Sequence, residues 1–249
     1  MFRTAFRRKS GAGASAQAMA DAIRADERRR QHRTAAWALP AAILPSAGLG
    51  YLAATSTNWY AGTAVISVIT VLALSRIYRT KGSTWATGAA GERKTARILA
   101  PLVWCGLGLW IVLHDRAIPR SRANIDTLVV ARFGLANVDS KTFKSKKSKV
   151  RLDAQGHLWY GRFSLQRKLE TVVWESNRAA EILGYPVRPI IAVHHAAIPP
   201  GGLISGGVTI IQAGELRRYL RSLPKEPGWN RARVRQVALL AEQMLPPAA

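Results

Sequence analysis

Two acids and one lysine of a predicted β-hairpin could do chemistry together. Asp139 and Lys141 are two residues apart, and because side chains alternate along a strand, both project from the same face. With the hairpin turn centred at residues 132–133, Asp126 lies almost opposite Asp139 on the paired strand. Cross-strand neighbours have Cβ atoms roughly 4.5–5.5 Å apart. These two carboxylates would therefore repel each other unless a cation or a shared proton lay between them.

A hard divalent ion would satisfy such a pair of carboxylates. Mg²⁺ is usually held by one or two carboxylates and several waters, and Mn²⁺ accepts the same oxygen ligands. Lys141 beside the ion could orient or deprotonate a water and stabilise charge that builds on a phosphate. By spacing alone, an Asp-x-Lys pair on a strand is also typical of a solvent-facing ion pair.

A third acid lies on the inner face of a predicted helix. Glu92, Thr95, Ala96, Leu99 and Val103 recur at the spacing of one helical face. Glu92 is the only carboxylate of that helix, so it faces the core, where an acid needs a partner or a function.

The remaining elements must position these side chains. Strands are predicted at 109–113, 124–131 and 135–141, a hairpin at 150–160, a helix at 165–183, strands at 187–193 and 207–211, and helices at 214–223 and 231–245. This order predicts an α/β fold in which helices flank a mixed sheet. The predicted buried stripe of the helix at 165–183 is Trp174, Ala179, Ile182 and Leu183.

A long uncharged stretch precedes this domain. Residues 34–75 contain no Asp, Glu, Lys, Arg or His, which is about twice the length of one membrane span. The polar residues 55–58 divide it into two predicted transmembrane helices, at about 35–54 and 59–78, with aromatic residues near their ends. The alternative is a helical hairpin buried inside a soluble protein.

The flanking charges predict how these helices cross the membrane. Arginines precede the first helix and follow the second, whereas the turn between them is uncharged. The positive-inside rule then places both termini and the domain in the cytoplasm, as in a multi-pass protein of the cell membrane. Residues 1–33 form a basic arm next to anionic lipid, with a helix at 16–31. The domain is expected at 82–223, followed by a C-terminal helix and tail at 224–249.

The overall charge indicates polyanionic partners. The formal net charge is +23 and the sequence pI is about 11.4, which favours nucleic acid, anionic lipid or both. The single cysteine, Cys105, excludes an intramolecular disulfide and a cysteine-rich zinc site. Its apolar neighbours predict a packing role.

Basic residues near the predicted hairpin could follow a nucleic-acid backbone beside the acids. They are Arg120, Arg122, Lys144, Lys146, Lys147 and Lys149. The alternative is a solvated loop held near anionic lipid.

Other chemistry-bearing residues favour structural roles. His194 and His195 follow an apolar strand, but no third ligand stands at a matching spacing, so packing at the strand end is expected. Trp159 and Tyr160 could stack on bases, although packing within the hairpin is the simpler expectation.

An ordered series of motifs resembles the NERD, or nuclease-related, domain in its actinobacterial, membrane-anchored branch. The resemblance covers roughly residues 82–195 and depends on the order of five segments: 88–99, 113–119, 123–126, 137–141 and 156–161. The family is regarded as related to the PD-(D/E)XK nucleases, so the resemblance implies a restriction-endonuclease-like sheet. One departure is Thr127, where the family commonly has His.

The resemblance also implies residue roles. Glu92 matches the helix acid and Asp126 the first strand acid, while Asp139 and Lys141 match the (D/E)-x-K pair. By analogy, Asp126 and Asp139 would bind Mg²⁺ or Mn²⁺, Lys141 would position the attacking water, and Glu92 would support the metal or a water.

Three functions remain open from the sequence. The first is metal-dependent phosphodiester hydrolysis of DNA at the cytoplasmic membrane face, with no small-molecule cofactor. The second is a non-catalytic, membrane-attached DNA-binding or interaction module on the nuclease scaffold. The third is lipid or protein scaffolding through the basic patches. The oligomeric state is not predicted.

Overall fold

The computed structural model describes residues 11–56, 58–78, 84–143, 145 and 148–248. The predicted nucleic-acid contacts Lys144, Lys146 and Lys147 lie outside the described residues. The chain forms two compact units, one of Ala18–Ser83 and one of Met1–Gln17 with Thr84–Ala249.

Two helices make up the smaller unit. Helix α1 is Ala14–Ser56, of which the first residues belong to the larger unit, and α2 is Trp59–Ile77. The helix predicted at 16–31 and the first predicted span are thus one continuous helix. Both helices are long and apolar enough to cross a membrane, by length and composition.

The two apolar helices approach each other closely at glycines. A Cβ on Gly62 would collide with the carbonyl oxygen of Gly50, and one on Gly50 would lie 2.7 Å from the side chain of Ile66. Close backbone approach at small residues is typical of helix pairs in membranes. Asn58 begins α2 by accepting a hydrogen bond from the Ala61 amide at 3.0 Å.

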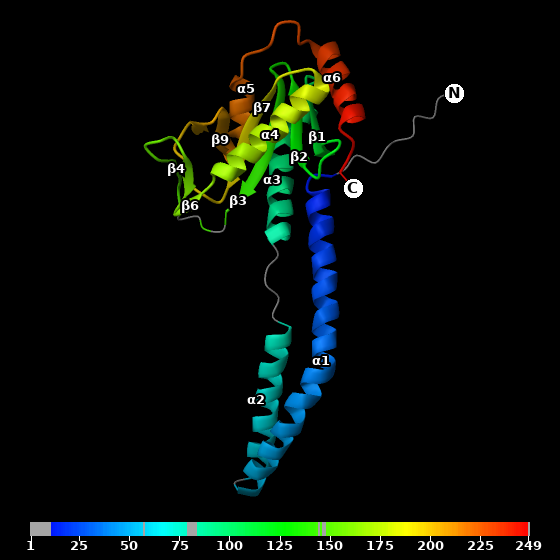
Figure 1. The fold of residues 1–249 in the computed structure, drawn as a ribbon, viewed down its shortest axis with the longest axis vertical. Coiled ribbons are helices and arrows are strands. Elements are labelled where there is room, and N and C mark those ends of the chain that lie inside the picture. The colour runs from blue at the N-terminus through cyan, green and yellow to red at the C-terminus, as the bar shows by residue number, and fades with distance from the viewer. Residues whose placement is uncertain (1–10, 57, 79–83, 144, 146–147, 249) are drawn as a thin grey trace, which may run out of the picture. The chain divides into compact units, whose positions relative to one another are not determined.

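A six-stranded mixed sheet is the centre of the larger unit (Figure 1). Its order is β1 (Trp110–Ala117), β2 (Asn124–Ala131), β3 (Gly134–Thr142), β7 (Val187–His194), β9 (Val208–Gln212) and β8 (Leu203–Ser205). The first three strands form an antiparallel meander, β7 runs parallel to β3 and to β9, and β8 is antiparallel to β9. The α/β class with a mixed sheet is confirmed.

Helices cover both faces of this sheet. Alternate residues of β2 and β3 point to opposite faces, and the two faces belong to separate hydrophobic clusters. On one face, α3 (Thr84–Cys105) packs with η1 (Ala213–Glu215) and α5 (Leu216–Ser222). On the other, α4 (Gln166–Leu183) packs with α6 (Arg231–Met244).

A second, three-stranded sheet contains the predicted hairpin at 150–160. It consists of β4 (Val150–Leu152), β5 (Leu158–Tyr160) and β6 (Phe163–Ser164). Trp159 donates its indole N–H to Asp153 at 2.8 Å, and the ring of Tyr160 lies 4.2 Å from that of Phe143. The structural roles expected for Trp159 and Tyr160 are therefore confirmed.

Three side chains predicted to pack inside are exposed, and the helical period explains two of them. The buried stripe of α3 runs through Thr95, Leu99 and Leu102, so Val103, one position further, is 39% exposed. Cys105 is exposed as well, and its predicted packing role is wrong. On α4, the stripe passes through Val172 and Ser176, which turns Trp174 outward on the helix.

Candidate active site

The β2–β3 hairpin has the predicted register. Leu128 pairs with Asn137, and Ala131 pairs with Gly134 across the turn. The paired ladder stops at Leu128, and the carboxylate of Asp126 then accepts a hydrogen bond from the Ser140 amide at 3.1 Å. Asp126 thus replaces a ladder contact with a side-chain contact at the open end of the hairpin.

Asp139 and Lys141 contact each other on the neighbouring strand. The Lys141 ammonium donates to Asp139 Oδ1 at 2.6 Å. Asp139 is buried, whereas the Lys141 side chain is 30% exposed. Oδ2 of Asp139 has no hydrogen-bond partner among the described atoms, so one lysine leaves half of this carboxylate unsatisfied.

Glu92 joins them from α3. It is buried, and its Oε2 also lacks a hydrogen-bond partner within the described part of the chain. A cavity of about 300 Å³ brings Glu92, Asp126 and Lys141 together. Its other lining residues are Ser15, Ala16, Thr87, Gly88, Asn124, Ser140, Thr142 and Lys168. Three of the four predicted site residues therefore line one pocket, and the fourth, Asp139, is bonded to Lys141.

The carboxylates of this pocket resist ionisation. Burial, followed by repulsion from Asp115 and Asp139, raises the pKa of Glu92 from 4.5 to about 7. Burial and repulsion from Asp139 and Glu92 also raise the pKa of Asp126 well above its usual value. The pocket therefore favours the protonated, neutral form of these carboxyl groups unless a cation enters it.

Lys141, in contrast to the carboxyl groups, is held in its charged form. Burial alone would lower its pKa, but attraction to Asp139 and Asp126 outweighs burial and raises the pKa above the ordinary lysine value. Lys141 therefore stays protonated near neutral pH and serves as a hydrogen-bond donor.

A buried polar chain fixes α3 against the strands behind the acids. Ser140 donates its hydroxyl to Thr95 Oγ1 at 2.8 Å, and Thr95 Oγ1 lies 2.9 Å from His194 Nε2. A Cβ on Gly91 would collide with Thr142 Oγ1, so α3 can approach β3 only with glycine there. His194 has the predicted packing role at the end of β7, while His195 is exposed.

The start of α1 forms another wall of the pocket. The Ser15 amide and hydroxyl donate to the two oxygens of Asp115 at 2.6 and 2.7 Å, and Asn124 donates to the same carboxylate at 2.8 Å. Asp115 is buried with φ +51°, a left-handed conformation that Asp tolerates better than most residues. This carboxylate therefore satisfies a free N–H of the first turn of α1.

Sequence reasoning missed this wall and one further acid. Glu175 on α4 has a pKa raised from 4.5 to about 7 by burial and then by repulsion from Asp139. No local pattern indicated that Ser15 meets Asp115, because they are distant in sequence. Glu175 precedes the buried Ser176 on α4, so its place next to the buried face of the helix could have indicated it.

The described basic candidates do not line the pocket. Arg120 and Arg122, in the β1–β2 connection, and Lys149, before β4, are exposed. Thr127, the departure from the family pattern, is buried, and its hydroxyl lies 3.0 Å from His114 Nδ1 on β1. Thr127 therefore has a structural contact across the meander.

No preformed three-ligand metal cluster is present among the residues that the structure describes. No group of three or more His, Cys, Asp or Glu side chains there is arranged to hold a metal ion. The donor set available for an ion is therefore the pair of strand carboxylates, with Glu92 nearby.

The comparisons with known proteins give a family-model match for this region. No curated protein and no solved structure matched the chain. A family model did, and it covers α3, the meander, the small sheet, α4 and β7, which are the elements that hold the four-residue site. Residues 87–196 match the model of NERD, the nuclease-related domain.

Proposed function

We propose that this domain hydrolyses phosphodiester bonds of DNA with the help of Mg²⁺ or Mn²⁺, at the cytoplasmic face of the membrane. One observation carries the proposal. Glu92, Asp126 and Lys141 line one pocket, Asp139 is bonded to Lys141, and one buried oxygen each of Glu92 and Asp139 has no partner among the described atoms. The match to a nuclease-related domain supports the same class of reaction.

The residues of the pocket fit a hard divalent ion. A buried carboxylate oxygen of Asp139 has no partner among the described atoms, and the raised pKa of Asp126 shows that its ionised form lacks compensation, so a bound cation would satisfy both groups. Asp126 and Asp139 would hold the ion, and two carboxylates suffice because Mg²⁺ keeps several of its waters. When bound, the ion would activate a water and offset charge on the phosphate.

The chain's own residues would supply the remaining chemistry. Lys141 is a protonated donor that would hydrogen-bond a water or a phosphate oxygen, at the cost of its bond to Asp139. Glu92, with a pKa near 7, would accept a proton from that water. The hydrogen-bonded series Ser140–Thr95–His194 would keep Glu92 and the strand acids in register.

Basic residues around the pocket would hold the DNA backbone. Arg120, Arg122 and Lys149 are exposed, and phosphate contacts of this type need no base recognition. Lys144, Lys146 and Lys147 would add to them. We therefore expect DNA affinity that falls with salt concentration.

The helical unit would anchor this activity to the membrane. The length and apolar composition of α1 and α2 support two spans, and arginines on both outer flanks support cytoplasmic termini and contact with anionic lipid. A reporter fused after Ala249 should be active only on the cytoplasmic side, and external labelling there would contradict this orientation.

A non-catalytic DNA-binding module is the second candidate. The ion pair between Lys141 and Asp139 partly neutralises the acid, and no three-ligand group is present among the described residues. Both observations would suit a nuclease scaffold that binds DNA without cleaving it.

A cleavage assay separates the two candidates. The full chain in detergent is incubated with single- and double-stranded DNA in Mg²⁺, Mn²⁺ or EDTA. Metal-dependent hydrolysis that Asp139→Asn abolishes and Glu170→Gln, an exposed acid on α4, leaves intact supports the enzyme. Salt-sensitive DNA binding without cleavage in any metal, unchanged by Asp139→Asn, supports the binding module.

A further inference from the structure

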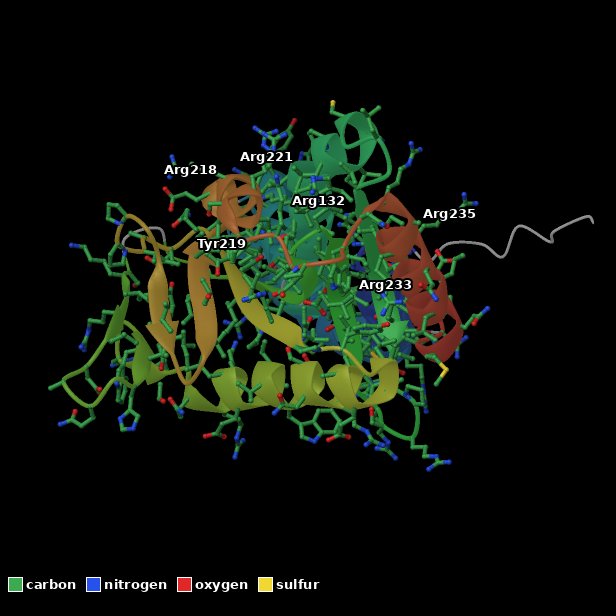
Figure 2. The ribbon with its side chains drawn as sticks, turned by 90° about the horizontal axis from the view of Figure 1, so that it is seen from above. Arg132, Arg218, Tyr219, Arg221, Arg233 and Arg235 are labelled. Carbon is green, nitrogen blue, oxygen red and sulfur yellow. The ribbon has the colours of Figure 1, made fainter. Side chains whose placement is uncertain are left out.

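A second concentration of charge lies at the turn end of the β2–β3 hairpin. Residues 216–236 carry seven arginines and lysines and a single acid, Glu226. With Arg132 in the hairpin turn, they surround the end of the sheet that carries this turn. Figure 2 labels the five arginines used below, which we call the arginine surface. They are Arg132, Arg218, Arg221, Arg233 and Arg235.

The arginine surface is separate from the carboxylate pocket. Arg132 is six residues from Asp126 along β2 and its turn, and a strand rises about 3.3 Å per residue, so the two lie about 20 Å apart. Among the described residues, none of these arginines lines the pocket. The surface therefore is not part of the site described above.

Most of its guanidinium groups are available to a partner. Arg132, Arg221 and Arg235 are exposed, and no ion pair involving them is found in the described part of the chain. Arg218 pairs with Glu215 at 2.6 Å but is 79% exposed, so the pair is weak. Like charges at this density repel one another, and a polyanion would relieve that repulsion.

Rigid elements present these arginines. Leu216 and Leu220 on α5, and Val234 and Val237 on α6, are buried in the core. The hydroxyl of Tyr219 lies 3.1 Å from Thr209 Oγ1 and holds α5 against β9. A surface fixed in this way loses little entropy when it binds.

The same packing favours a nucleic-acid backbone over a lipid surface. A helix that binds a membrane surface inserts an apolar face among the lipids, but the apolar faces of α5 and of the first half of α6 are already in the core. What remains outside is arginine, whose planar fork matches phosphate oxygens in a bidentate manner.

We propose that the arginine surface binds the phosphate backbone of nucleic acid, about 20 Å from the carboxylate pocket. This second contact goes beyond the proposed hydrolysis and does not depend on it. Since each nucleotide step spans 3.4 Å, a duplex must be about six base pairs long to reach from the pocket to this surface. Longer duplexes therefore bind more tightly than shorter ones.

The test measures DNA binding by the full chain in detergent, with EDTA present so that no cleavage occurs. Fluorescence anisotropy of a labelled 20-base-pair duplex compares the double variant Arg221→Glu/Arg235→Glu with the control Arg167→Glu/Arg178→Glu. The control changes the net charge equally, but its residues lie on α4. All four positions are on the surface of their helices, and thermal melting checks that both proteins fold.

We expect the arginine variant to weaken binding at least tenfold and to reduce the slope of log K against log salt by about 2. The control should change affinity less than threefold. Equal losses in both variants, or none in either, would overturn the proposal. So would unchanged DNA binding with lost binding to vesicles of anionic phospholipid, which would assign the surface to lipid.

Cleavage and binding measured on the same proteins separate this proposal from the proposed hydrolysis. If no cleavage is found under any condition but binding still depends on Arg221 and Arg235, the hydrolysis fails and the arginine surface stands. If cleavage occurs and the arginine variant binds DNA normally, the proposed hydrolysis stands and the proposed arginine surface fails.

Discussion

The two ends of one hairpin carry opposite charge in opposite environments. At the open end, Asp139 is buried, and burial followed by repulsion from Asp139 raises the pKa of Asp126. At the turn end, Arg132 and its neighbours are exposed to solvent. Water stabilises the arginines without a ligand, whereas the buried acids depend on a lysine, a proton or a bound ion. Single substitutions should therefore have large effects at the open end and small, additive ones at the turn.

The largest effect is expected from removal of Lys141, the pocket cation that contacts Asp139. In Lys141→Ala, Asp139 and Asp126 lose their compensating charge, so the free energy of unfolding at pH 8 should fall by about 2 kcal/mol, a value reduced for the partial exposure of Lys141. DNA cleavage should fall at least 100-fold. Denaturant unfolding and the cleavage assay measure the two effects.

The control for this lysine is Lys94→Ala. Lys94 is exposed, with its ammonium 2.9 Å from His195 Nε2, and it should change stability by less than about 0.5 kcal/mol. Equal effects of the two substitutions would show that the buried acids do not depend on Lys141.

A stability effect of similar size and opposite sign is expected from Glu92→Gln. The folded chain holds the Glu92 proton up to about pH 7, whereas a free glutamate releases it near 4.5. Stability is therefore lost as the pH rises from 4.5 to 7, and the glutamine variant escapes that loss. At pH 8 it should be more stable by about 2 kcal/mol.

Chemical denaturation at pH 4 and pH 8 measures this difference. The stabilisation should vanish at pH 4, where Glu92 is protonated in both the folded and the unfolded chain. A variant that is less stable at both values would show that the Glu92 carboxylate is well compensated and would remove the argument for an uncompensated pocket.

The sequence predicts a site residue where the strand or helix periodicity around it shows which way its side chain faces. The two-residue period of β3 and the turn at Arg132 are enough to bring Asp126, Asp139 and Lys141 together. The helical period places Glu92 inward, as the structure has it. The contact of Ser15 with Asp115 has no local signal, because a helix N-terminus can be capped by any distant acid.

The same limit applies to the elements around the site. Strands β2, β3 and β7 and helix α4 follow from alternation and helical period within a residue or two of the prediction, whereas β1 continues four residues beyond its predicted end. The short strands β6 and β8 do not, since two or three residues carry too little pattern. Trp174 was expected inside because it is apolar, but its angular position on α4 decides its exposure.

A modest effect is expected at the wall that the start of α1 adds to the pocket. Ser15→Ala removes the hydroxyl bond to Asp115 but keeps the amide bond, so stability should fall by about 1 kcal/mol. Thermal melting measures this, with Ser222→Ala, which removes an exposed hydroxyl bonded to the Tyr219 carbonyl of its own helix, as a matched control. No change in the melting temperature would contradict a role of Ser15 in holding this wall.

The smallest effect is expected at the turn end. Arg132→Ala should leave the melting temperature unchanged and weaken duplex binding only two- to fourfold, because one exposed charge among several contributes little alone. Anisotropy titrations at two salt concentrations measure it. A loss of more than 30-fold would show that Arg132 acts as a buried, specific contact, unlike its neighbours.

Divalent-ion binding tests the central claim most directly, because it asks whether the buried acids have a ligand without requiring catalysis. Mn²⁺ is titrated into the full chain in detergent and bound ion is measured by electron paramagnetic resonance. The account predicts one Mn²⁺ per chain, lost in Asp139→Asn and in Asp126→Asn but retained in Arg221→Glu/Arg235→Glu. Equal Mn²⁺ binding by the aspartate variants and the unmodified chain would contradict it.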